Sequence, residues 1–422
     1  MPTRHGDLAR IRVFAWYRAL PVGGRGAFWG CFGAIAADSM DLRAFSFLLP
    51  AIAAAWQLSP GQVGLLGGAS LGTAAAGGWT AGLLSDRYGR VRVMQASLLA
   101  CSAATVLSGF TTAYDELLAC RMAQGLGFGT QVTSGAIVMA ELVRPEHRGR
   151  AVSWAQSGVA VGWAMAALLS AVLLAGLPAG LGWRAVCWLA VLPAGFSFVM
   201  HRFIWDSELS RRTRLRRAPG GLWHGAAGLF RPGVRRMTLL ANLLALGVQG
   251  SGVILLVWLP TYLAGVRRIP IAGAGGYVSV LACGAFCGYV AGGHLSDSRG
   301  RRQKFLIFAA GSAAVLALYL FAPLGDVNVL LLGLPLGFFS QGSYSSLGLF
   351  FSELYPTCIR GSGTSFAYGI GRLGAAAWVV VVGLAAPVVS LGGAIGIACL
   401  CCYGLVAVAA LLLPETRGRR MP

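Results

Sequence analysis

One short charged sequence occurs twice in this chain, and it constrains the fold more than any other feature. The first copy reads Gly-Leu-Leu-Ser-Asp-Arg-Tyr-Gly-Arg from Gly82 to Arg90, and the second reads Gly-His-Leu-Ser-Asp-Ser-Arg-Gly-Arg from Gly293 to Arg301. The offset is 211 residues in a chain of 422. Long apolar segments flank both copies. A charged turn that recurs between apolar segments indicates a duplicated helical membrane bundle.

A second pair of sequences repeats almost in the same register. Glu141 is followed by Arg148-Gly, and Glu353 is followed by Arg360-Gly, with an offset of 212 residues. We predict that both pairs form latches that hold one side of the protein closed and break during transport; the alternative is a set of plain topological turns. The predicted gating residues are Gly82, Asp86, Arg87, Gly89, Arg90, Asp297, Gly300, Arg301, Glu141, Arg148, Glu353 and Arg360.

Composition supports the membrane interpretation. Apolar residues make up 56% of the chain and charged residues 11%, whereas soluble domains carry about 25% charge. Segments of about 20 apolar residues are long enough to span a bilayer, and only helices satisfy the backbone of such isolated segments in lipid. We therefore predict an all-α membrane protein with twelve transmembrane helices in two pseudo-symmetric six-helix halves. The expected parts are a cytoplasmic N-terminal segment (1–26), an N-terminal half (27–204), a basic cytoplasmic linker (205–235), a C-terminal half (236–413) and a cytoplasmic tail (414–422).

The net charge of +20 is distributed unevenly. All but six of the 34 Lys and Arg residues lie in segments on one side of the predicted spans. Such a bias places that side, with both termini, in the cytoplasm. The basic surface is then expected to meet lipid headgroups rather than nucleic acid.

The loop from Gly82 to Arg90, between the second and third predicted spans, resembles the signature loop of the major facilitator superfamily. The resemblance extends over almost the whole chain. It implies a secondary transporter in which two halves rock about a central site, and the repeat structure is the one expected for that fold.

The first predicted span contains Asp38-Ser-Met-Asp-Leu-Arg43. Asp38 and Asp41 share a helix face, and an ionised carboxylate at mid-membrane costs roughly 2.5 kcal/mol or more. Burial and a nearby like charge both favour the protonated form, so the pair is suited to carrying a proton. The alternative is a structural pair tied permanently to Arg43 or to another arginine.

The Asp-x-x-Asp pattern, followed by Pro50, resembles the Asp-Gly-x-Asp motif of the aromatic acid:proton symporters and the related sialate carriers, with Ser39 in place of the glycine. This resemblance implies a transport role for Asp38 and Asp41. Arg121, in Arg-x-x-Gln-Gly-x-Gly-x-Gly, is similar to the superfamily's fourth-span arginine, which is associated with proton coupling. Arg121 could instead extend to the headgroups.

Arg372 lies in the eleventh predicted span, within a segment that resembles the aromatic acid and nicotinate carriers. Guanidinium stays charged, so it needs a partner or an aqueous cavity. It is suited to binding a substrate carboxylate, or it pairs with Asp38 or Asp41. The predicted substrate contacts are Arg372, Arg43, Gln249 and Gln124.

Enzyme function is not predicted. The five His residues are scattered, the ten Cys residues lack metal-ligand spacing and no Walker A loop is present. We expect no catalytic residue, no metal and no cofactor, with the proton gradient as the energy source.

We predict proton-coupled uptake of a small organic anion, such as an aromatic acid or acidic sugar, by a monomer in the bacterial inner membrane. The fifth span lacks the Gly-Pro motif of drug-export antiporters, which favours symport. Proton-driven efflux of drugs or metabolites is the alternative within transport. A non-transporting membrane receptor with the same fold is the alternative from another class.

Overall fold

The computed structural model describes residues 15–18, 20, 22–204, 227–267, 271–323 and 325–419. Residues 1–14, most of the predicted linker (205–226) and the last three residues lie outside this part of the chain. Predictions about those segments therefore stay predictions. The side chains of residues 271–278 are likewise not described.

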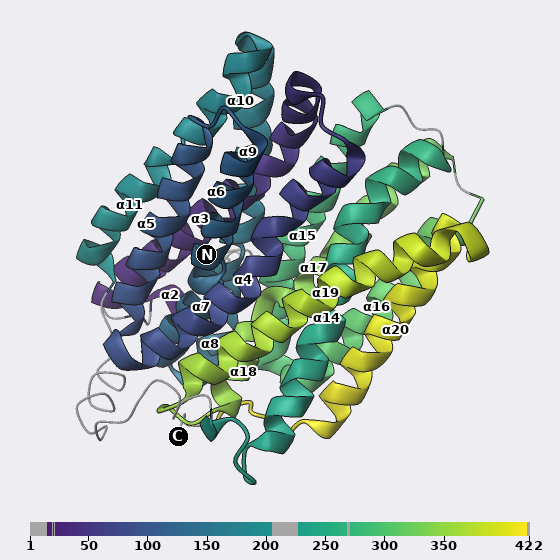
Figure 1. Ribbon diagram of the computed structural model, residues 1–422. Helices are drawn as coiled ribbons and strands as arrows, with labels where there is room; N and C mark the ends of the chain where they lie inside the picture. Colours follow the sequence, from purple (N-terminus) through teal and green to yellow (C-terminus); the bar gives the residue numbers. More distant parts are fainter. Residues whose placement is uncertain are drawn as a thin grey trace, which may run out of the picture.

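All regular structure in the described residues is helical, and each predicted span corresponds to one helix or to consecutive helices (Figure 1). After the short α2 (Ala15–Arg18), the N-terminal half contains α3 (Val22–Trp56), α4 (Pro60–Tyr88), α5 (Arg90–Ser108), α6 (Tyr114–Gly127), α7 (Thr130–Leu142), η1 (Pro145–His147), α8 (Arg148–Gln156), α9 (Gly158–Gly176), α10 (Ala179–Trp188) and α11 (Val191–Phe203). The C-terminal half contains α14 (Arg235–Gly265), α15 (Ile271–Arg299), α16 (Arg301–Phe321), α17 (Asp326–Gly342), η2 (Ser343–Ser346), α18 (Leu347–Leu354), α19 (Arg360–Val389) and α20 (Leu391–Leu412). These helices make twelve spans in two six-span halves, as predicted.

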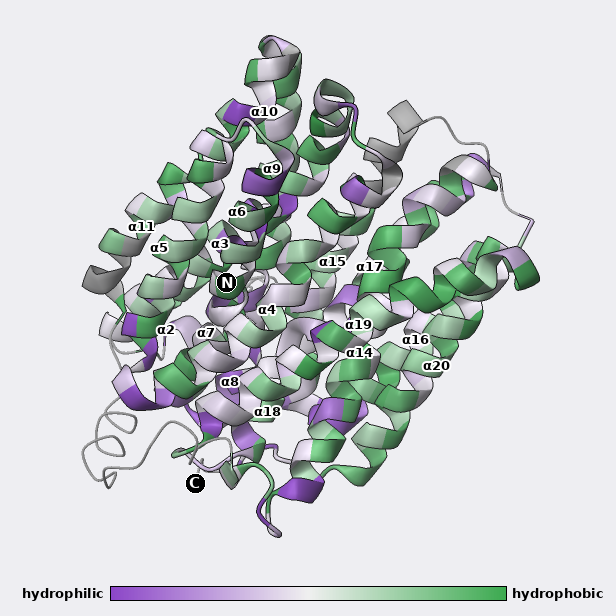
Figure 2. Cartoon of the chain, in the orientation of Figure 1, coloured by the Kyte–Doolittle hydropathy of each residue, from purple (hydrophilic) through white to green (hydrophobic). Residues whose placement is uncertain are grey.

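Six helical segments in the described residues are long and apolar enough, by length and composition, to cross a membrane. The remaining spans carry charge or are interrupted: α3 contains Asp38, Asp41 and Arg43, and the fourth span is split between α6 and α7. Much of the helical bundle consists of hydrophobic residues (Figure 2), and many large apolar side chains are exposed, such as Phe198 at 73%. Such a surface matches lipid rather than water.

The fourth span of each half is broken at a similar depth. In the N-terminal half, Gly129 has φ +87° between α6 and α7, a conformation that side chains disfavour. In the C-terminal half the short η2 separates α17 from α18. Both breaks free backbone groups inside the bundle, which is tolerated where neighbouring helices or a cavity satisfy them.

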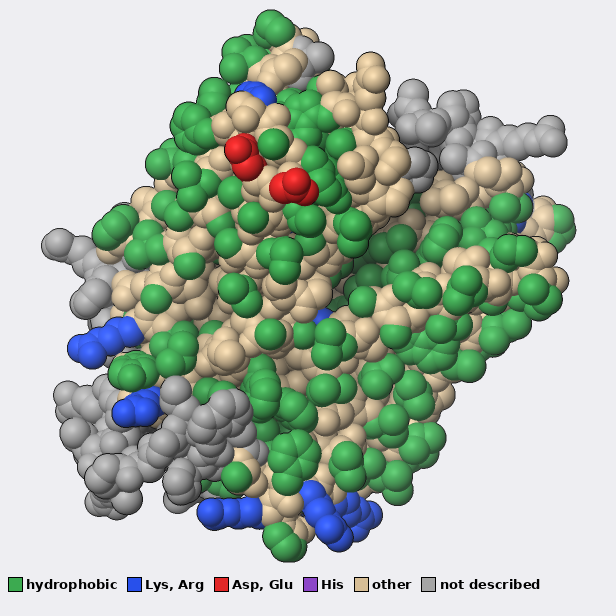
Figure 3. Space-filling view, in the orientation of Figure 1, with side chains coloured by type: hydrophobic (Ala, Val, Ile, Leu, Met, Phe, Trp, Pro, Cys, Tyr) green, Lys and Arg blue, Asp and Glu red, His purple; other side chains and the backbone are tan. Residues whose placement is uncertain are grey.

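The two halves meet most closely at one end of the bundle, which we call the basic end because it carries the two Asp-x-x-Gly-Arg loops. There α4 packs against α19 and α15 packs against α8. Toward the other end the halves diverge (Figure 1), and a hollow opens between them (Figure 3). Exposure follows the same gradient: on α19, Gly363 and Ala367 are buried, whereas Leu384 is 74% exposed. The halves are therefore closed at the basic end and open at the opposite end.

Candidate functional site

The buried core of the N-terminal half is divided into two apolar clusters. One cluster lies toward the basic end and includes Met94 and Met139. The other lies toward the open end and includes Phe45, Leu117 and Trp183. A layer of buried polar side chains occupies the depth between them. This layer consists of Asp38, Asp41, Ser70, Cys101, Thr105, Arg121 and Gln124.

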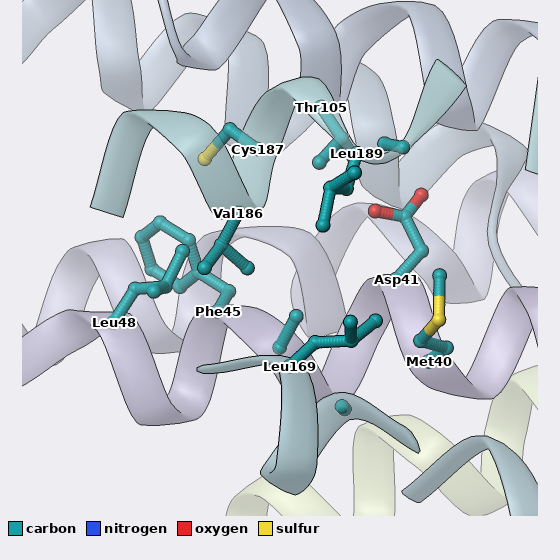
Figure 4. A pocket seen from close by; sticks show the side chains of 12 residues that line it. Met40, Asp41, Phe45, Leu48, Thr105, Leu169, Val186, Cys187 and Leu189 are labelled. Atoms are coloured by element: carbon teal, nitrogen blue, oxygen red, sulfur yellow. The ribbon is translucent and has the colours of Figure 1, made fainter. Parts of the chain in front are cut away.

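Asp41, on α3, lies inside the N-terminal half and is 3% exposed. Its Oδ2 accepts a hydrogen bond from the thiol of Cys101 at 3.2 Å. Its Oδ1 has no hydrogen-bond partner among the described residues. The side chain borders a cavity of about 20 Å³, which is room for roughly one water molecule. In Figure 4 the carboxylate points toward Thr105 and Leu189. An open acceptor beside a water-sized cavity is an arrangement that can bind and release a proton.

Arg121 and Gln124, on α6, complete this polar layer. The Arg121 guanidinium lies 3.7 Å from the centre of the Phe45 ring, and it donates hydrogen bonds to Ser70 Oγ at 2.8 Å and to Gln124 Oε1. Gln124 donates in turn to Thr105 Oγ1 at 2.7 Å. Arg121 is 3% exposed and is electrostatically coupled to Asp41. Both residues thus lie beside Asp41, inside one half.

Asp38 is directed to different neighbours from Asp41, although the two are one helical turn apart. It is 1% exposed, and neither of its carboxylate oxygens has a hydrogen-bond partner in the described part of the chain. It lies beside Gly129 of the broken fourth span and is electrostatically coupled to Arg372 of the other half. A buried carboxylate without hydrogen bonds is costly in its ionised form. Protonation of Asp38 would remove this cost.

Arg372 crosses from α19 into the N-terminal half. Its Nη1 donates to the carbonyl of Ala74 on α4 at 3.1 Å, and its guanidinium lies 5.1 Å from the Phe128 ring centre. A Cβ atom on Gly129 would collide with this guanidinium, and one on Gly78 would approach it to 3.0 Å. The glycines therefore leave the space that the Arg372 guanidinium occupies. No salt bridge within 4.0 Å joins the two in the described residues.

Arg43 is the second cation that faces the other half, and aromatic residues surround it. Its guanidinium lies 5.1 Å from the centre of the Trp163 ring on α9. The hydroxyl groups of Tyr289 on α15 and Tyr344 on η2 are its electrostatic neighbours. Tyr344 is also a neighbour of Arg372, as is Tyr368 on α19. These contacts join groups from both halves into one region, which we call the inter-half cluster: Asp38, Arg43, Trp163, Tyr289, Tyr344, Tyr368 and Arg372.

The sequence analysis did not single out Trp163 or the three tyrosines. Each lies in an apolar helix where an aromatic residue is equally expected as packing. The only available signal is that Tyr289 and Tyr368 lie well inside their helices rather than at the ends, where Tyr is enriched in membrane proteins.

Gln249, predicted as a substrate contact, connects two helices of the C-terminal half. The side-chain amide nitrogen of Gln249 donates to the backbone carbonyl of Tyr368 at 3.1 Å. The backbone carbonyl of Gln249 accepts a hydrogen bond from the Tyr344 hydroxyl at 3.3 Å. The residue is 5% exposed. Gln249 therefore contacts two of the three tyrosines of the inter-half cluster, Tyr344 and Tyr368.

At the basic end, the loop of each half binds the start of a helix in the other half. Asp86 accepts hydrogen bonds from the backbone N–H groups of Gly361 at 3.0 Å and Ser362 at 2.8 Å, in the first turn of α19. Asp297 accepts from the N–H groups of Gly149 at 2.8 Å and Arg150 at 2.9 Å, in the first turn of α8. A carboxylate is favoured at a helix N-terminus. These two contacts, latch one and latch two, close the basic end.

Four glycines permit this closeness. Gly89 and Gly300 turn the chain at φ +104° and +101°. A Cβ atom on Gly82 would lie 2.5 Å from Ser365 Cβ, and one on Gly293 would lie 2.5 Å from Ser153 Cβ. The exposed Arg87 lies over the Tyr88 ring at 5.5 Å and faces away from the contact.

Ion pairs reinforce the latches differently. Glu141 pairs with Arg90 of its own half and with Arg360 of the other half, the latter at 2.6 Å. Glu353 binds Arg301 through two hydrogen bonds of 2.9 and 3.0 Å, within its own half. Arg148 instead donates to the backbone carbonyls of Val143 and Arg419.

The C-terminal residues supply further contacts at latch two. Glu415 accepts from the N–H groups of Arg301 at 3.0 Å and Arg302 at 3.1 Å, in the first turn of α16. Thr416 donates to Glu353 at 2.5 Å. These two residues were not predicted, because nothing in the repeat marks them.

Comparisons with known proteins agree with this architecture. The family model described as Major Facilitator Superfamily matches residues 31–379. The probable 4-methylmuconolactone transporter of Cupriavidus pinatubonensis is 38% identical over 406 residues, covering 96% of this chain and 94% of the relative. The cis,cis-muconate transport protein of Acinetobacter baylyi is 30% identical over 381 residues, covering 88% and 89%.

Among solved structures, the proton:xylose symporter XylE has a TM-score of 0.76 at 18% identity, covering 94% of this chain and 97% of that structure. At that identity the likeness concerns the fold. Family, fold and relatives agree that this chain is a membrane transporter, not an enzyme, and that it belongs to the major facilitator superfamily.

Proposed function

We propose that this protein takes up a small organic acid together with protons, by alternating access to the inter-half cluster. The observation that carries the proposal is Asp38. Both of its oxygens lack hydrogen bonds among the described residues, and its electrostatic partner Arg372 comes from the other half. A proton on Asp38 would therefore change the interaction between the halves directly.

Coupling follows from competition for Arg372. An ionised Asp38 balances the Arg372 guanidinium, and protonation of Asp38 releases that cation for a substrate carboxylate. Within the Asp38–Arg372 pair, either event alone leaves one charge unbalanced in the membrane interior, at a cost of roughly 2.5 kcal/mol or more. Binding proton and acid together avoids that cost, which favours symport.

Asp41 is proposed to exchange protons with Asp38. Its free Oδ1 and the adjacent water-sized cavity support this role. Arg121 stabilises its ionised form from within the same half. Gln124, which orders Arg121, is then a supporting residue of the proton site rather than a direct substrate contact.

The closed basic end and the hollow at the opposite end support an outward-facing state, with the basic end and both termini in the cytoplasm. Inward opening would require both latches and the Glu141–Arg360 pair to separate. We propose that the protein acts as a monomer in the bacterial inner membrane.

The substrate class is proposed from the relatives, which are named for 4-methylmuconolactone and cis,cis-muconate. Both compounds are small unsaturated carboxylic acids. The aromatic side chains and arginines of the inter-half cluster suit planar anions of this kind.

The test is uptake by purified protein in liposomes with an imposed pH gradient, using both acids. Inward-directed protons should drive accumulation, and Asp38→Asn and Asp41→Asn should abolish it. Asp115→Asn, which removes an exposed carboxylate at the open end, is the matched control. Accumulation indifferent to the gradient, or an Asp41→Asn variant as active as the parent, would refute the coupling. If the acids accumulate only when the imposed proton gradient is directed outward, proton-driven efflux is assigned instead.

A further inference from the structure

Arg43 is a cation for which the structure provides no counter-ion. In the described residues it forms no hydrogen bond, and no carboxylate lies within 4.0 Å of it. Its side chain is partly exposed, unlike the buried Arg121. The groups around it are the Trp163 ring and the hydroxyls of Tyr289 and Tyr344. Three neutral groups that hold a guanidinium without neutralising it leave it available to an anion.

A count of charges at this depth gives the same result. The inter-half cluster and the polar layer beside it contribute the carboxylates of Asp38 and Asp41 and the guanidinium groups of Arg43, Arg121 and Arg372. Arg121 is coupled to Asp41, and Arg372 is coupled to Asp38. Arg43 is left over. With both carboxylates ionised, the region carries one surplus positive charge.

When Asp38 takes up a proton, the surplus rises to two positive charges, on Arg43 and Arg372. A monoanion would leave one of them unbalanced. A dianion would balance both, and each of its carboxylates would meet one guanidinium. Since each uncompensated charge in a membrane interior costs roughly 2.5 kcal/mol or more, the proton-loaded site favours a dianion.

We infer that the site is built for a dicarboxylate that is transported with one proton, and that Arg43 binds its second carboxylate. The inference rests on the proposed function and narrows its substrate class. Arg372, on α19, binds the first carboxylate once Asp38 is protonated. Tyr344 neighbours both arginines, so a substrate bound to Arg43 and Arg372 would lie beside it. The Tyr289 hydroxyl can donate to the same carboxylate, because a tyrosine hydroxyl is a donor as well as an acceptor, whereas the Tyr344 hydroxyl already donates to the backbone of Gln249.

The test compares two probes that differ by one charge: cis,cis-muconate and its monomethyl ester. Initial uptake rates are measured in liposomes with and without an inward proton gradient. The parent should prefer the dianion, and the gradient should stimulate dianion uptake more than ester uptake. In Arg43→Gln the preference for the dianion should fall by roughly 10- to 100-fold, the range for one hydrogen-bonded charge contact. The monoester should lose little.

Arg43→Lys keeps the positive charge and should retain most of the dianion preference. Arg236→Gln, which removes an exposed arginine at the start of α14, is the matched control and should leave the ratio unchanged. Size-exclusion profiles and melting temperatures of the purified variants establish that each is folded.

The outcomes separate this inference from the proposed function. A parent that accumulates acids with the gradient, but whose dianion preference survives Arg43→Gln, refutes the role of Arg43 alone. Equal proton dependence for the dianion and the monoester also overturns the charge assignment. A parent that shows no gradient-driven uptake of either probe refutes the proposed function, and this inference falls with it.

Discussion

Asp38 and Gln249 occupy the same position in the two halves, 211 residues apart, yet their side chains do different things. Asp38 is a carboxylate whose oxygens have no hydrogen-bond partner among the described residues, whereas the Gln249 amide is bonded to the carbonyl of Tyr368. The N-terminal half thus keeps a group that can change its charge, and the C-terminal half keeps one that cannot. Duplication preserved the helix and its polar position, while the chemistry became specialised in one half.

The apolar cores of the two halves also differ, because a layer of polar side chains divides only that of the N-terminal half. One large apolar cluster contains most of the core of the C-terminal half, from Leu229 to Leu413, and also includes Trp163 of the N-terminal half. The N-terminal half has two main clusters separated by the Asp41–Arg121 layer. A polar layer costs stability but permits proton exchange, and a continuous apolar core gives a rigid body. We therefore expect substitutions in the two halves to have different effects on coupling and on stability.

The largest effect is expected from substitutions at Asp38 and Gln249, the equivalent positions of the two halves. Asp38→Gln makes the N-terminal position resemble its counterpart and should reduce gradient-driven uptake to background, because the proton-binding group nearest Arg372 is lost. Gln249→Ala should instead lower the melting temperature while the dependence of residual uptake on the gradient persists. Liposome uptake and thermal unfolding in detergent measure both. Loss of gradient dependence in Gln249→Ala would abolish the distinction between the halves.

The latches provide the second comparison. Glu141→Gln removes a carboxylate that pairs with Arg90 and Arg360 and leaves two buried arginines without it. Breaking a buried pair typically costs about 3–5 kcal/mol, so the basic end should open. Glu353→Gln loses contacts inside its own half, so opening should be smaller. Spin labels on the two halves at the basic end should report a larger increase in distance in the first variant than in the second. Equal distances in both variants would contradict this asymmetry.

Gly82→Ala and Gly293→Ala test a feature that the two latches share, the close approach of a glycine to a serine of the other half. Each new Cβ atom would lie 2.5 Å from a serine Cβ across the inter-half contact. Overpacking of this kind costs about 1–3 kcal/mol, and it should weaken closure of the basic end equally in the two variants. The same distance measurement applies. A clear effect in only one variant would show that one helix pair dominates the closure.

The smallest effect is expected for Cys101→Ala. The thiol donates to Oδ2 of Asp41 at 3.2 Å, and its loss removes one stabilising contact from the ionised carboxylate. A net hydrogen bond contributes about 0.5–1.5 kcal/mol, so the pH midpoint of uptake should move upward by about one unit or less. Cys101→Ser should restore the midpoint, since a hydroxyl also donates. An unchanged midpoint in Cys101→Ala would remove the thiol from the proton site.

Much of the architecture was accessible from the sequence. Apolar runs of sufficient length predicted the twelve spans, because lipid leaves a single segment no alternative to a helix. The repeat predicted two related halves, and it marked Asp86 and Asp297 as equivalent. Composition also identified the charged residues within spans, since such residues are rare in lipid.

The site was only partly accessible. Helical periodicity predicted that Asp38 and Asp41 share a face, yet Asp41 borders a cavity inside its own half and Asp38 lies beside Arg372. The two side chains leave α3 roughly one turn apart and in slightly different directions, and different neighbouring helices lie in those directions. The tyrosines of the inter-half cluster carried no charge or motif that would have marked them.

The sequence by itself determined which segments cross the membrane, that the bundle is duplicated, and which residues bring charge into the membrane interior. Those properties depend on local composition and on chain length, so they can be read along the chain. Only the tertiary structure decided which charges influence one another: Arg372 acts electrostatically on Asp38, which is 334 positions away in the sequence, and Arg43 has no carboxylate within 4.0 Å among the described residues. The rotation of each helix and the packing of one half on the other set those contacts, and both are collective results of many side chains.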